Sequence, residues 1–273
     1  MHRVSNIQIC AVDLARAVIR LRHLILGVAL LFSLGCAEDR GRDTSQVPRV
    51  ACPNCITPQT LRSQSAAARV APRLNQEFAT ASLRLGAPIF IRIFKESREL
   101  ELWVKKGAGF VLFKTYPIAF FSGSLGPKFR EGDYQAPEGF YYVSPRGMNP
   151  RSKYHLAFNI GYPNPFDRAH QRTGSAIMVH GKRVSAGCFA MTDPLIEEIY
   201  TIADHALNNG QPFFRVHIFP FRMTEANMLR HERSVHHAFW KNLQEGHAFF
   251  ENVRRPPDVT VKDRRYVFKA DDL

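Results

Sequence analysis

The chain has 273 residues, of which 45% are hydrophobic and 22% are charged. These values exclude a wholly disordered protein and allow one large domain or two small ones. Lysine and arginine outnumber aspartate and glutamate by 37 to 24, so the formal net charge is +13. This excess favours an anionic partner, such as a nucleic acid, a membrane surface or a carboxylate-rich polymer, without choosing among them.

The first 35 residues have the order of an export signal. Basic residues precede an apolar run over residues 24–34, and Gly35 and Cys36 follow it. The run is too short for a membrane-spanning anchor, so we expect a signal peptide over residues 1–35. Residues 33–36 also resemble a lipobox, which leaves a lipid anchor at Cys36 open. Export argues against a nucleic-acid partner.

Cysteine usage singles out one thiol. Cys10 leaves with the expected signal peptide, and Cys36 sits at the cleavage point. Cys52 and Cys55 could form a small disulfide; they lack the preceding strand of a thioredoxin-like site and the second cysteine pair of a zinc ribbon. Cys188 is left alone, and an odd thiol in an exported protein is either a reactive group or a buried structural residue.

The middle of the chain has the alternation of β-strands. Residues 36–86 are expected to form a linker and a helical lead-in that begins near position 61. From Pro88 onwards, apolar residues alternate along two runs joined by residues 95–98, which predicts a hairpin. A third run covers residues 110–121 and is interrupted at Pro117. After a glycine-rich connection, further strands are expected at 140–143, 176–180 and 213–219.

One helix is predicted directly after Met191. Asp193 is a candidate N-cap, Pro194 suits the first turn, and Asn209-Gly210 ends an apolar stripe. The stripe consists of Ile196, Ile199, Tyr200, Ala203 and Leu207. We therefore predict a mostly β (α+β) catalytic domain over residues 87–220, with this helix inserted, and a C-terminal extension over 221–273 that is helical with a last strand at 265–269.

Cys188 lies close to the groups that a cysteine nucleophile needs. His180 ends the predicted strand at 176–180, and Cys188 stands a few residues before the predicted helix. An imidazole or a helix N-terminus can lower the pKa of a thiol and so supply the thiolate. Gly187 allows the close backbone approach that an oxyanion pocket of main-chain N–H groups requires. Lys182 and Arg183 between them could steer an anionic peptide or be solvated charges.

The order His180, then Ser185-Ala186-Gly187-Cys188, resembles the active-site signature of the YkuD-type L,D-transpeptidases. The resemblance extends over residues 87–270 to the YafK branch of that family, also called DpaA. Its further blocks are residues 91–96, 125–128, 137–141, 159–164, 167–170, 219–224 and 255–257.

This resemblance implies a β-sandwich-like catalytic domain in which Cys188 is the nucleophile and His180 the general acid/base. It places Gly187, Ser185 and Gly181 as candidate substrate-binding or oxyanion residues, and it implies no cofactor and no metal. The implied substrate is a peptidoglycan stem peptide that forms a thioester at diaminopimelate in the periplasm. The YafK branch implies hydrolysis of the amide link between the stem and a lipoprotein.

Two positions depart from the pattern of many L,D-transpeptidases, which carry His two places before the Cys and Arg two places after it. Here these positions are Ala186 and Ala190. The missing Arg removes a donor suited to gripping a carboxylate. Both departures agree with the YafK branch. A transpeptidase that forms cross-links or attaches lipoprotein remains an alternative, as does a wall-binding lipoprotein without catalysis.

Other candidates have weaker support. His231 and His236 are five residues apart, whereas a zinc-protease helix needs four, so a solvated helix is the better interpretation. The short block around Asp167 either contacts substrate or ties down a loop; its polar members are Asp167, Arg168 and His170. Helical spacing in the extension predicts apolar packing by Phe239, Trp240 and Leu243.

Overall fold

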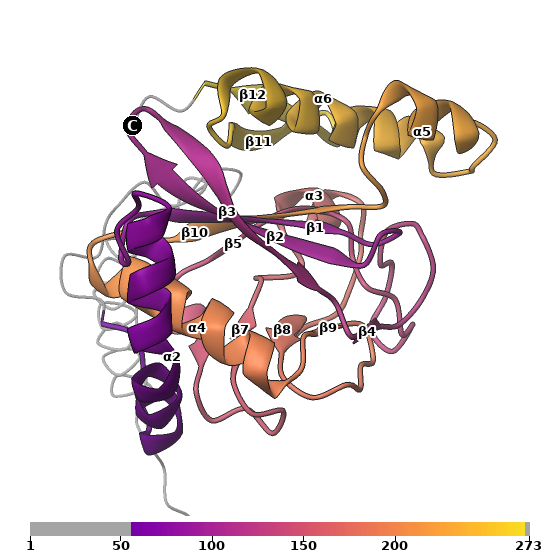
Figure 1. Cartoon of the computed structure of the whole chain (residues 1–273). Coiled ribbons are helices and arrows are strands. Elements are labelled where there is room, and N and C mark those ends of the chain that lie inside the picture. The colour runs from indigo at the N-terminus through magenta and orange to yellow at the C-terminus, as the bar shows by residue number, and fades with distance from the viewer. Residues whose placement is uncertain (1–55, 271–273) are drawn as a thin grey trace, which may run out of the picture. The chain divides into compact units, whose positions relative to one another are not determined.

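The computed structural model describes residues 56–270. The expected signal peptide, Cys36 and the Cys52/Cys55 pair lie outside these residues. The described part is a mixed α+β fold with two five-stranded sheets and one two-stranded hairpin. Its main sheet lies between a layer that contains α4 and the second sheet and a layer that contains α6, β11 and β12 (Figure 1). Among residues 56–270, no helix is long and apolar enough to cross a bilayer.

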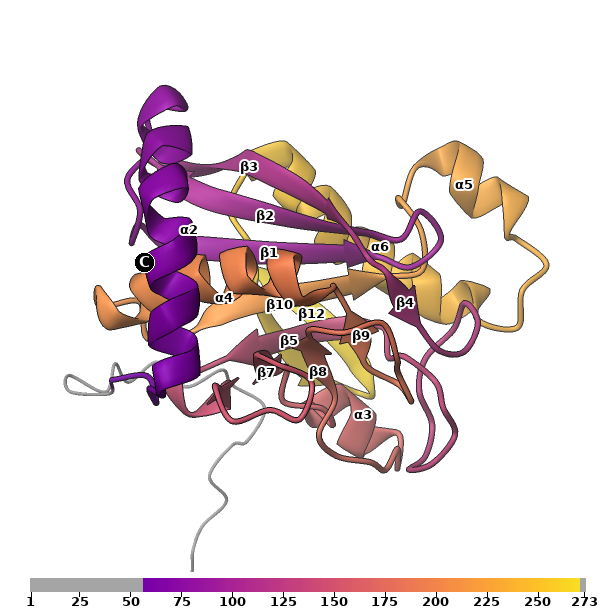
Figure 2. The same cartoon turned by 60° about the horizontal axis from the view of Figure 1, so that its bottom comes forward.

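The main sheet has the strand order β3-β2-β1-β10-β5 (Figure 2). Its strands are β1 (Ile89–Phe94), β2 (Glu99–Lys106), β3 (Gly109–Pro117), β5 (Gly139–Val143) and β10 (Phe214–Phe219). The predicted hairpin is confirmed, because β1 and β2 pair antiparallel with Ile93 opposite Leu100. β1 and β10 are neighbours that pair in parallel, although they are far apart in the chain. The segment between them contains the whole second sheet and α4 as well as β2, β3 and β5.

The two faces of the main sheet bury different kinds of side chain. One face carries the alternating Ile, Leu and Val side chains of β1, β2 and β10, which form the principal core with α2 (Leu61–Thr80) and α4 (Asp193–Asn208). The other face carries Arg92, Glu101 and His217, all at most 3% exposed. Both faces of β1 are covered, and charged groups therefore lie buried on the second face as an ion-paired network.

The helix after Met191 forms as predicted, with one correction at its start. Asp193 is the first helical residue and does not cap it; Thr192 occupies the N-cap with a left-handed backbone and no capping hydrogen bond from its side chain. The Asp193 carboxylate instead accepts the Lys182 N–H at 2.8 Å. Asn209 ends the helix, and every residue of the predicted apolar stripe is buried.

The second sheet has the order β4-β9-β8-β7-β6, and its strands are very short. They are β4 (Phe120–Phe121), β6 (Met148–Asn149), β7 (Ala157–Asn159), β8 (Met178–His180) and β9 (Phe189–Ala190), with the 3-10 turn η1 (Pro145–Gly147) before β6 and helix α3 (Pro165–Ala169) after β7. Strands of two or three residues show no alternation, which is why sequence patterns predicted only the one around β8 and the apolar end of the run that includes β4.

The C-terminal extension packs on the charged face of the main sheet (Figure 1). It contains α5 (Glu225–Arg230), α6 (His237–Val253), β11 (Asp258–Lys262) and the predicted last strand β12 (Arg265–Lys269). Trp240 and Leu243 are buried, as expected, in a second core with Phe219 and Phe221. The solvated helix expected around His231 and His236 is wrong, because these residues lie in the turns between α5 and α6.

Candidate active site

The β8–β9 pair brings His180 and Cys188 to one face of the second sheet. These strands are parallel, with Val179 opposite Phe189. This register sets Cys188 beside Met178, and His180 follows Met178 by two residues, so all three side chains lie on the same face. The Met178 N–H donates to Cys188 Sγ at 3.4 Å, in agreement with that placement. His180 and Cys188 are therefore on the same face of the sheet, although eight positions separate them in the sequence.

The His180 ring is held in one tautomer. Its Nδ1 lies 2.5 Å from the Gly181 carbonyl oxygen, which can only accept, so Nδ1 carries a hydrogen and the neutral ring keeps its lone pair at Nε2. The residue is 2% exposed, and the half-exposed Tyr154 covers the ring at a centroid distance of 4.7 Å. Burial lowers the pKa of His180 below its usual 6.5, although the bond to Gly181 acts in the opposite direction.

Cys188 is a partly buried, neutral thiol. Burial raises its pKa above the usual 9.0, and neither the Met178 N–H nor the Lys128 charge reverses the shift. The expected lowering of this pKa by a helix N-terminus is wrong, because β9 separates Cys188 from α4. With the pKa of His180 lowered and that of Cys188 raised, the pair is thiol and imidazole at neutral pH. Proton transfer must then accompany nucleophilic attack.

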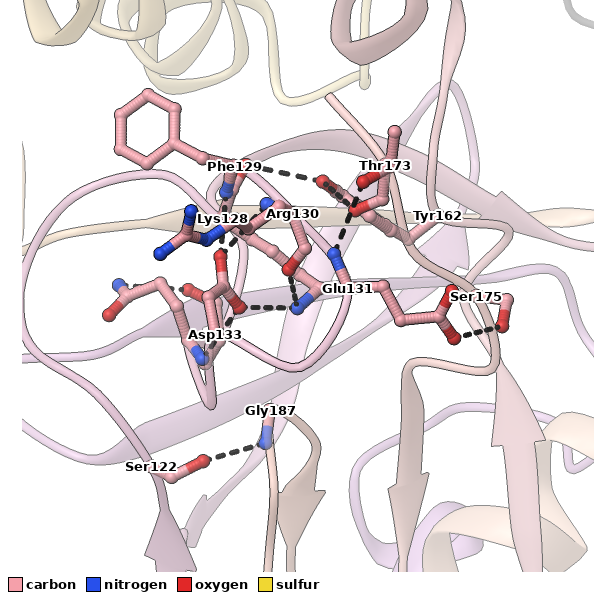
Figure 3. Close-up of polar contacts among 12 residues, drawn as sticks. Ser122, Lys128, Phe129, Arg130, Glu131, Asp133, Tyr162, Thr173, Ser175 and Gly187 are labelled. Carbon is pink, nitrogen blue, oxygen red and sulfur yellow. Dashed lines mark hydrogen bonds and ion pairs between the residues drawn. The ribbon is translucent and has the colours of Figure 1, made fainter. Parts of the chain in front are cut away.

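Gly187 shapes the turn before Cys188. Its φ of +115° is a conformation open mainly to glycine, and a Cβ there would lie 3.2 Å from the Gln135 carbonyl oxygen. The Gly187 N–H donates to Ser122 Oγ at 2.6 Å (Figure 3). It also donates to Ser185 Oγ at 3.2 Å. Ser185 Oγ in turn donates to the Cys188 carbonyl at 2.7 Å. Ser185 and Gly187 thus hold the turn before Cys188 together.

Gly181 has a similar positioning role. Its N–H donates to the carbonyl oxygens of Tyr154 and Leu156 at 3.0 and 3.1 Å. A Cβ at this position would come within 2.5 Å of Asp193 Oδ1, so only glycine fits between the strand end and the first turn of α4. The N–H groups of Gly181 and Gly187 therefore already have protein acceptors in this conformation.

A loop over residues 122–136, here called the active-site loop, forms the wall beside Gly187 (Figure 3). Asp133 is its centre: Oδ2 accepts the N–H groups of Phe129 and Arg130, and Oδ1 accepts the Gln135 N–H and the Lys128 ammonium. Burial alone would raise the pKa of Asp133, but these hydrogen bonds, led by that from Arg130, hold it below its usual 3.8. Lys128 itself is only 3% exposed.

The active-site loop is also tied to the irregular segment that leads into β8. The Glu131 N–H donates to Thr173 Oγ1 at 3.2 Å, and Ser175 Oγ donates to the Glu131 carboxylate at 3.3 Å. The Thr173 N–H donates to the Phe129 carbonyl, and the Tyr162 hydroxyl donates to the Lys128 carbonyl (Figure 3). The loop and β8 thus form one wall of the site.

The block around Asp167 ties down a loop. Asp167 is fully buried and completes the capping box of α3, whose N-cap is Asn164, by accepting the Asn164 N–H. It also accepts from Arg172 at 2.9 Å and from Tyr141 Oη at 3.0 Å. His170 Nε2 contacts the Arg264 carbonyl, outside the Cys188 site. Among residues 56–270, no group of three His, Cys, Asp or Glu side chains is arranged to hold a metal ion.

Comparison with known proteins gives the family. The sequence model of the YkuD L,D-transpeptidase catalytic domain matches residues 88–218. A curated protein of Escherichia coli K12, named "Putative L,D-transpeptidase YafK", is 49% identical over 183 residues, which cover 67% of this chain and 74% of that protein. The chain belongs to the L,D-transpeptidase family. It is therefore a member of an enzyme family that acts on peptidoglycan.

Two solved structures resemble part of the fold. A mutant of the helical cell shape determining protein Pgp2 from Campylobacter jejuni has a TM-score of 0.41 and 21% identity, covering 60% of this chain and 56% of that one. Bd1075 of Bdellovibrio bacteriovorus has a TM-score of 0.39 and 17% identity, covering 67% and 84%. The match thus spans little more than half of the Pgp2 chain.

Several residues of this L,D-transpeptidase site were not singled out by sequence. They are Ser122, Asp133, Tyr154 and, although it lies in a recognised block, Lys128. Asp133 had a local signal, since an aspartate after glycine in a polar stretch commonly accepts the N–H two residues on, as it does from Gln135. Ser122 and Tyr154 had none, because the sheet brings them to the site from distant parts of the chain.

Asp133→Asn is expected to loosen the active-site loop while leaving the two sheets folded. Losing the charge weakens its hydrogen bonds to the Lys128 ammonium and the backbone, so amides over residues 123–136 should exchange at least about tenfold faster. Hydrogen exchange with mass spectrometry measures this. Glu131→Gln is the control, since its side chain accepts only from Ser175, and a change in exchange restricted to the main sheet would contradict the role of Asp133.

Proposed function

We propose that this protein is a periplasmic cysteine enzyme that hydrolyses the amide linking a lipoprotein to the peptidoglycan stem. The observation that carries the proposal is the placement of Cys188 and His180 on one face of the β8–β9 pair, with the Nε2 lone pair of the imidazole left free by the Nδ1 bond to Gly181. Family membership supplies peptidoglycan as the polymer. The resemblance to the YafK branch indicates that the bond cleaved is the amide between the stem and the lipoprotein.

The reaction follows from the neutral state of the pair. Cys188 Sγ attacks the diaminopimelate carbonyl while His180 Nε2 takes the thiol proton. The tetrahedral intermediate then expels the lipoprotein amine, which receives that proton from His180, and a thioester remains on Cys188. Water attacks the thioester with His180 as base, so the stem leaves as a carboxylic acid and the thiol is restored.

Stabilisation of the oxyanion needs hydrogen-bond donors next to Cys188. Gly187, Ser185 and Gly181 are the backbone and hydroxyl candidates, with Gly187 N–H available to a substrate only if it leaves Ser122. The Ser122 hydroxyl accepts from Gly187, and its own hydrogen has no acceptor among residues 56–270. We therefore add Ser122 as a side-chain donor to the developing oxyanion.

The environment of Ala190 supports hydrolysis over cross-linking. Ala190 is fully buried between His180 on β8 and Phe120 on β4, so no cation projects from this position towards the substrate. An enzyme that joins two stems has to hold a donor stem and an acceptor amine together. When water is the acceptor, the enzyme does not have to bind a second stem peptide. The substitution of alanine at positions 186 and 190 is consistent with that simpler requirement.

The test incubates the purified protein with sacculi that carry covalently attached lipoprotein. Released proteins and muropeptides are identified by mass spectrometry. We expect intact lipoprotein with its terminal side-chain amine free, and no release by Cys188→Ala. New cross-links or exchanged stem termini without release would replace hydrolysis with transpeptidation.

Acylation by a carbapenem separates an enzyme from a wall-binding protein without catalysis. Wild-type protein is expected to gain the mass of the β-lactam at Cys188, because His180 activates the thiol, and His180→Gln should acylate at least about 100-fold more slowly. Intact-protein mass spectrometry over time measures the rate. A wild-type rate no higher than that of free cysteine would favour the binding protein.

A further inference from the structure

A basic groove lies at the end of the main sheet remote from Cys188. β2 runs from Glu99, which pairs with Pro117 near the second sheet, to Lys106 at the turn into β3. The groove opens at this turn, beside the C-terminal ends of α4 and α6, and encloses about 390 Å³. Its cationic lining residues are Arg84, Lys105, Arg215 and Arg255.

The charge of this groove is not balanced by the protein. No aspartate or glutamate lines it. Arg215 pairs with Asp258, whereas Arg84, Lys105 and Arg255 have no acidic partner among residues 56–270. Three uncompensated cations around one hollow repel one another, and a bound anion relieves that repulsion. By contrast, Arg92 on β1 is paired with Glu101 and Glu251, and Lys114 on β3 is paired with Glu77 and Glu198.

Apolar groups adjoin the cations. Phe110 and Phe213 line the groove, and the Phe110 N–H donates to the Arg254 carbonyl at 2.7 Å, which joins β3 to the end of α6. Next to these residues, Val253 at the end of α6 is 44% exposed. Exposed apolar side chains beside clustered cations suit the interface of a bilayer, where phosphates meet acyl chains. A soluble wall polymer would need no apolar rim.

We propose that this groove binds the phosphate of an anionic phospholipid headgroup and docks the domain on a membrane surface. Arg84, Lys105 and Arg255 contact the phosphate, and Val253 faces the acyl boundary. Because the groove and Cys188 lie at opposite ends of the main sheet, the docked domain presents its active site away from the bilayer. The inference is independent of the bond that the enzyme cleaves.

The test measures co-sedimentation with vesicles of phosphatidylcholine alone and of phosphatidylcholine mixed with phosphatidylglycerol. All arms use the full chain with Cys36→Ser, so that lipidation cannot contribute and any apolar N-terminal segment is common to all. Each cation near an anionic surface contributes about fivefold in affinity, so the triple variant Arg84→Gln/Lys105→Gln/Arg255→Gln should lose about 100-fold on mixed vesicles. Its affinity for phosphatidylcholine alone should not change.

The matched control removes the same charge from exposed positions outside the groove, with Arg146→Gln/Arg151→Gln/Arg233→Gln, and should lose less than about fivefold. Equal losses in both triple variants would reduce the effect to net charge and overturn the proposal. So would wild-type binding that does not depend on phosphatidylglycerol. A third outcome is that glycerol phosphate stabilises the wild type but not the groove variant, while the wild type does not bind vesicles. The groove would then bind a free phosphate ester instead of a lipid headgroup.

Discussion

His180→Gln is expected to lower the rate of lipoprotein release by at least about 10⁴-fold, as is Cys188→Ala. In the proposed mechanism both residues act in the same proton transfer, because a thiol with a raised pKa has to lose its proton to Nε2 as it attacks. The double variant should therefore be no slower than either single one. Release from sacculi, followed by mass spectrometry in single-turnover conditions, measures all three rates.

The pH profile provides the check on that mechanism. The proposed base is the neutral His180 ring, and burial lowers the pKa of His180, so the rate should rise with pH through a value below 6.5 and then reach a plateau at neutral pH. The plateau should extend above 9, since the pKa of Cys188 is raised and the thiol stays protonated there. An acidic limb that persists in His180→Gln, or additive losses in the double variant, would contradict a shared proton transfer.

Periodicity in the sequence was sufficient to predict the larger elements. Ile89, Ile91 and Ile93 alternate with residues on the opposite face, so the hairpin and its register follow from the period of two. The helix after Met191 combines a proline in its first turn, an apolar stripe and a terminal Asn-Gly, each of which has a local physical cause. Such elements were confirmed because neighbours along the chain determine them.

Features that depend on distant partners were not predicted. Arg92 and Lys95 look like the exposed residues of a hairpin, yet they are 3% and 0% exposed. The extension covers Arg92, and the active-site loop and Glu138 enclose the Lys95 ammonium. In the candidate site, Cys188 and His180 were found because they are close in sequence. Ser122 and Asp133 were not, because the active-site loop meets Gly187 only through the folded sheets.

Glu138→Ala is expected to reduce the free energy of unfolding by about 3–5 kcal/mol. Its carboxylate is fully buried and pairs with the equally buried Lys95 ammonium at 2.9 Å. It also accepts the Gly126 N–H at 2.6 Å and Trp240 Nε1 at 2.8 Å. Removing it leaves a charge inside the protein with only carbonyl acceptors. Denaturant unfolding monitored by circular dichroism gives the difference.

The adjacent surface pair is the matched control. Glu96 lies next to Lys95 in the same turn but pairs with Arg230 at the surface, so Glu96→Ala should cost less than about 1 kcal/mol. The double variant Lys95→Met/Glu138→Leu removes both buried charges and should recover most of the loss. A double variant as unstable as Glu138→Ala would show that the lost bonds to Gly126 and Trp240 cause the effect.

Glu138 also connects the C-terminal extension to the site. One oxygen holds Gly126 of the active-site loop and the other holds Trp240 of α6. Trp240→Phe keeps most of the apolar contact and removes only the N–H donor, so it should change stability by about 1 kcal/mol. If the extension positions the active-site loop, Trp240→Phe should speed hydrogen exchange around Gly126 more than in the distant β2–β3 turn. Uniform exchange in both regions would reduce the extension to a stabilising layer without a role at the site.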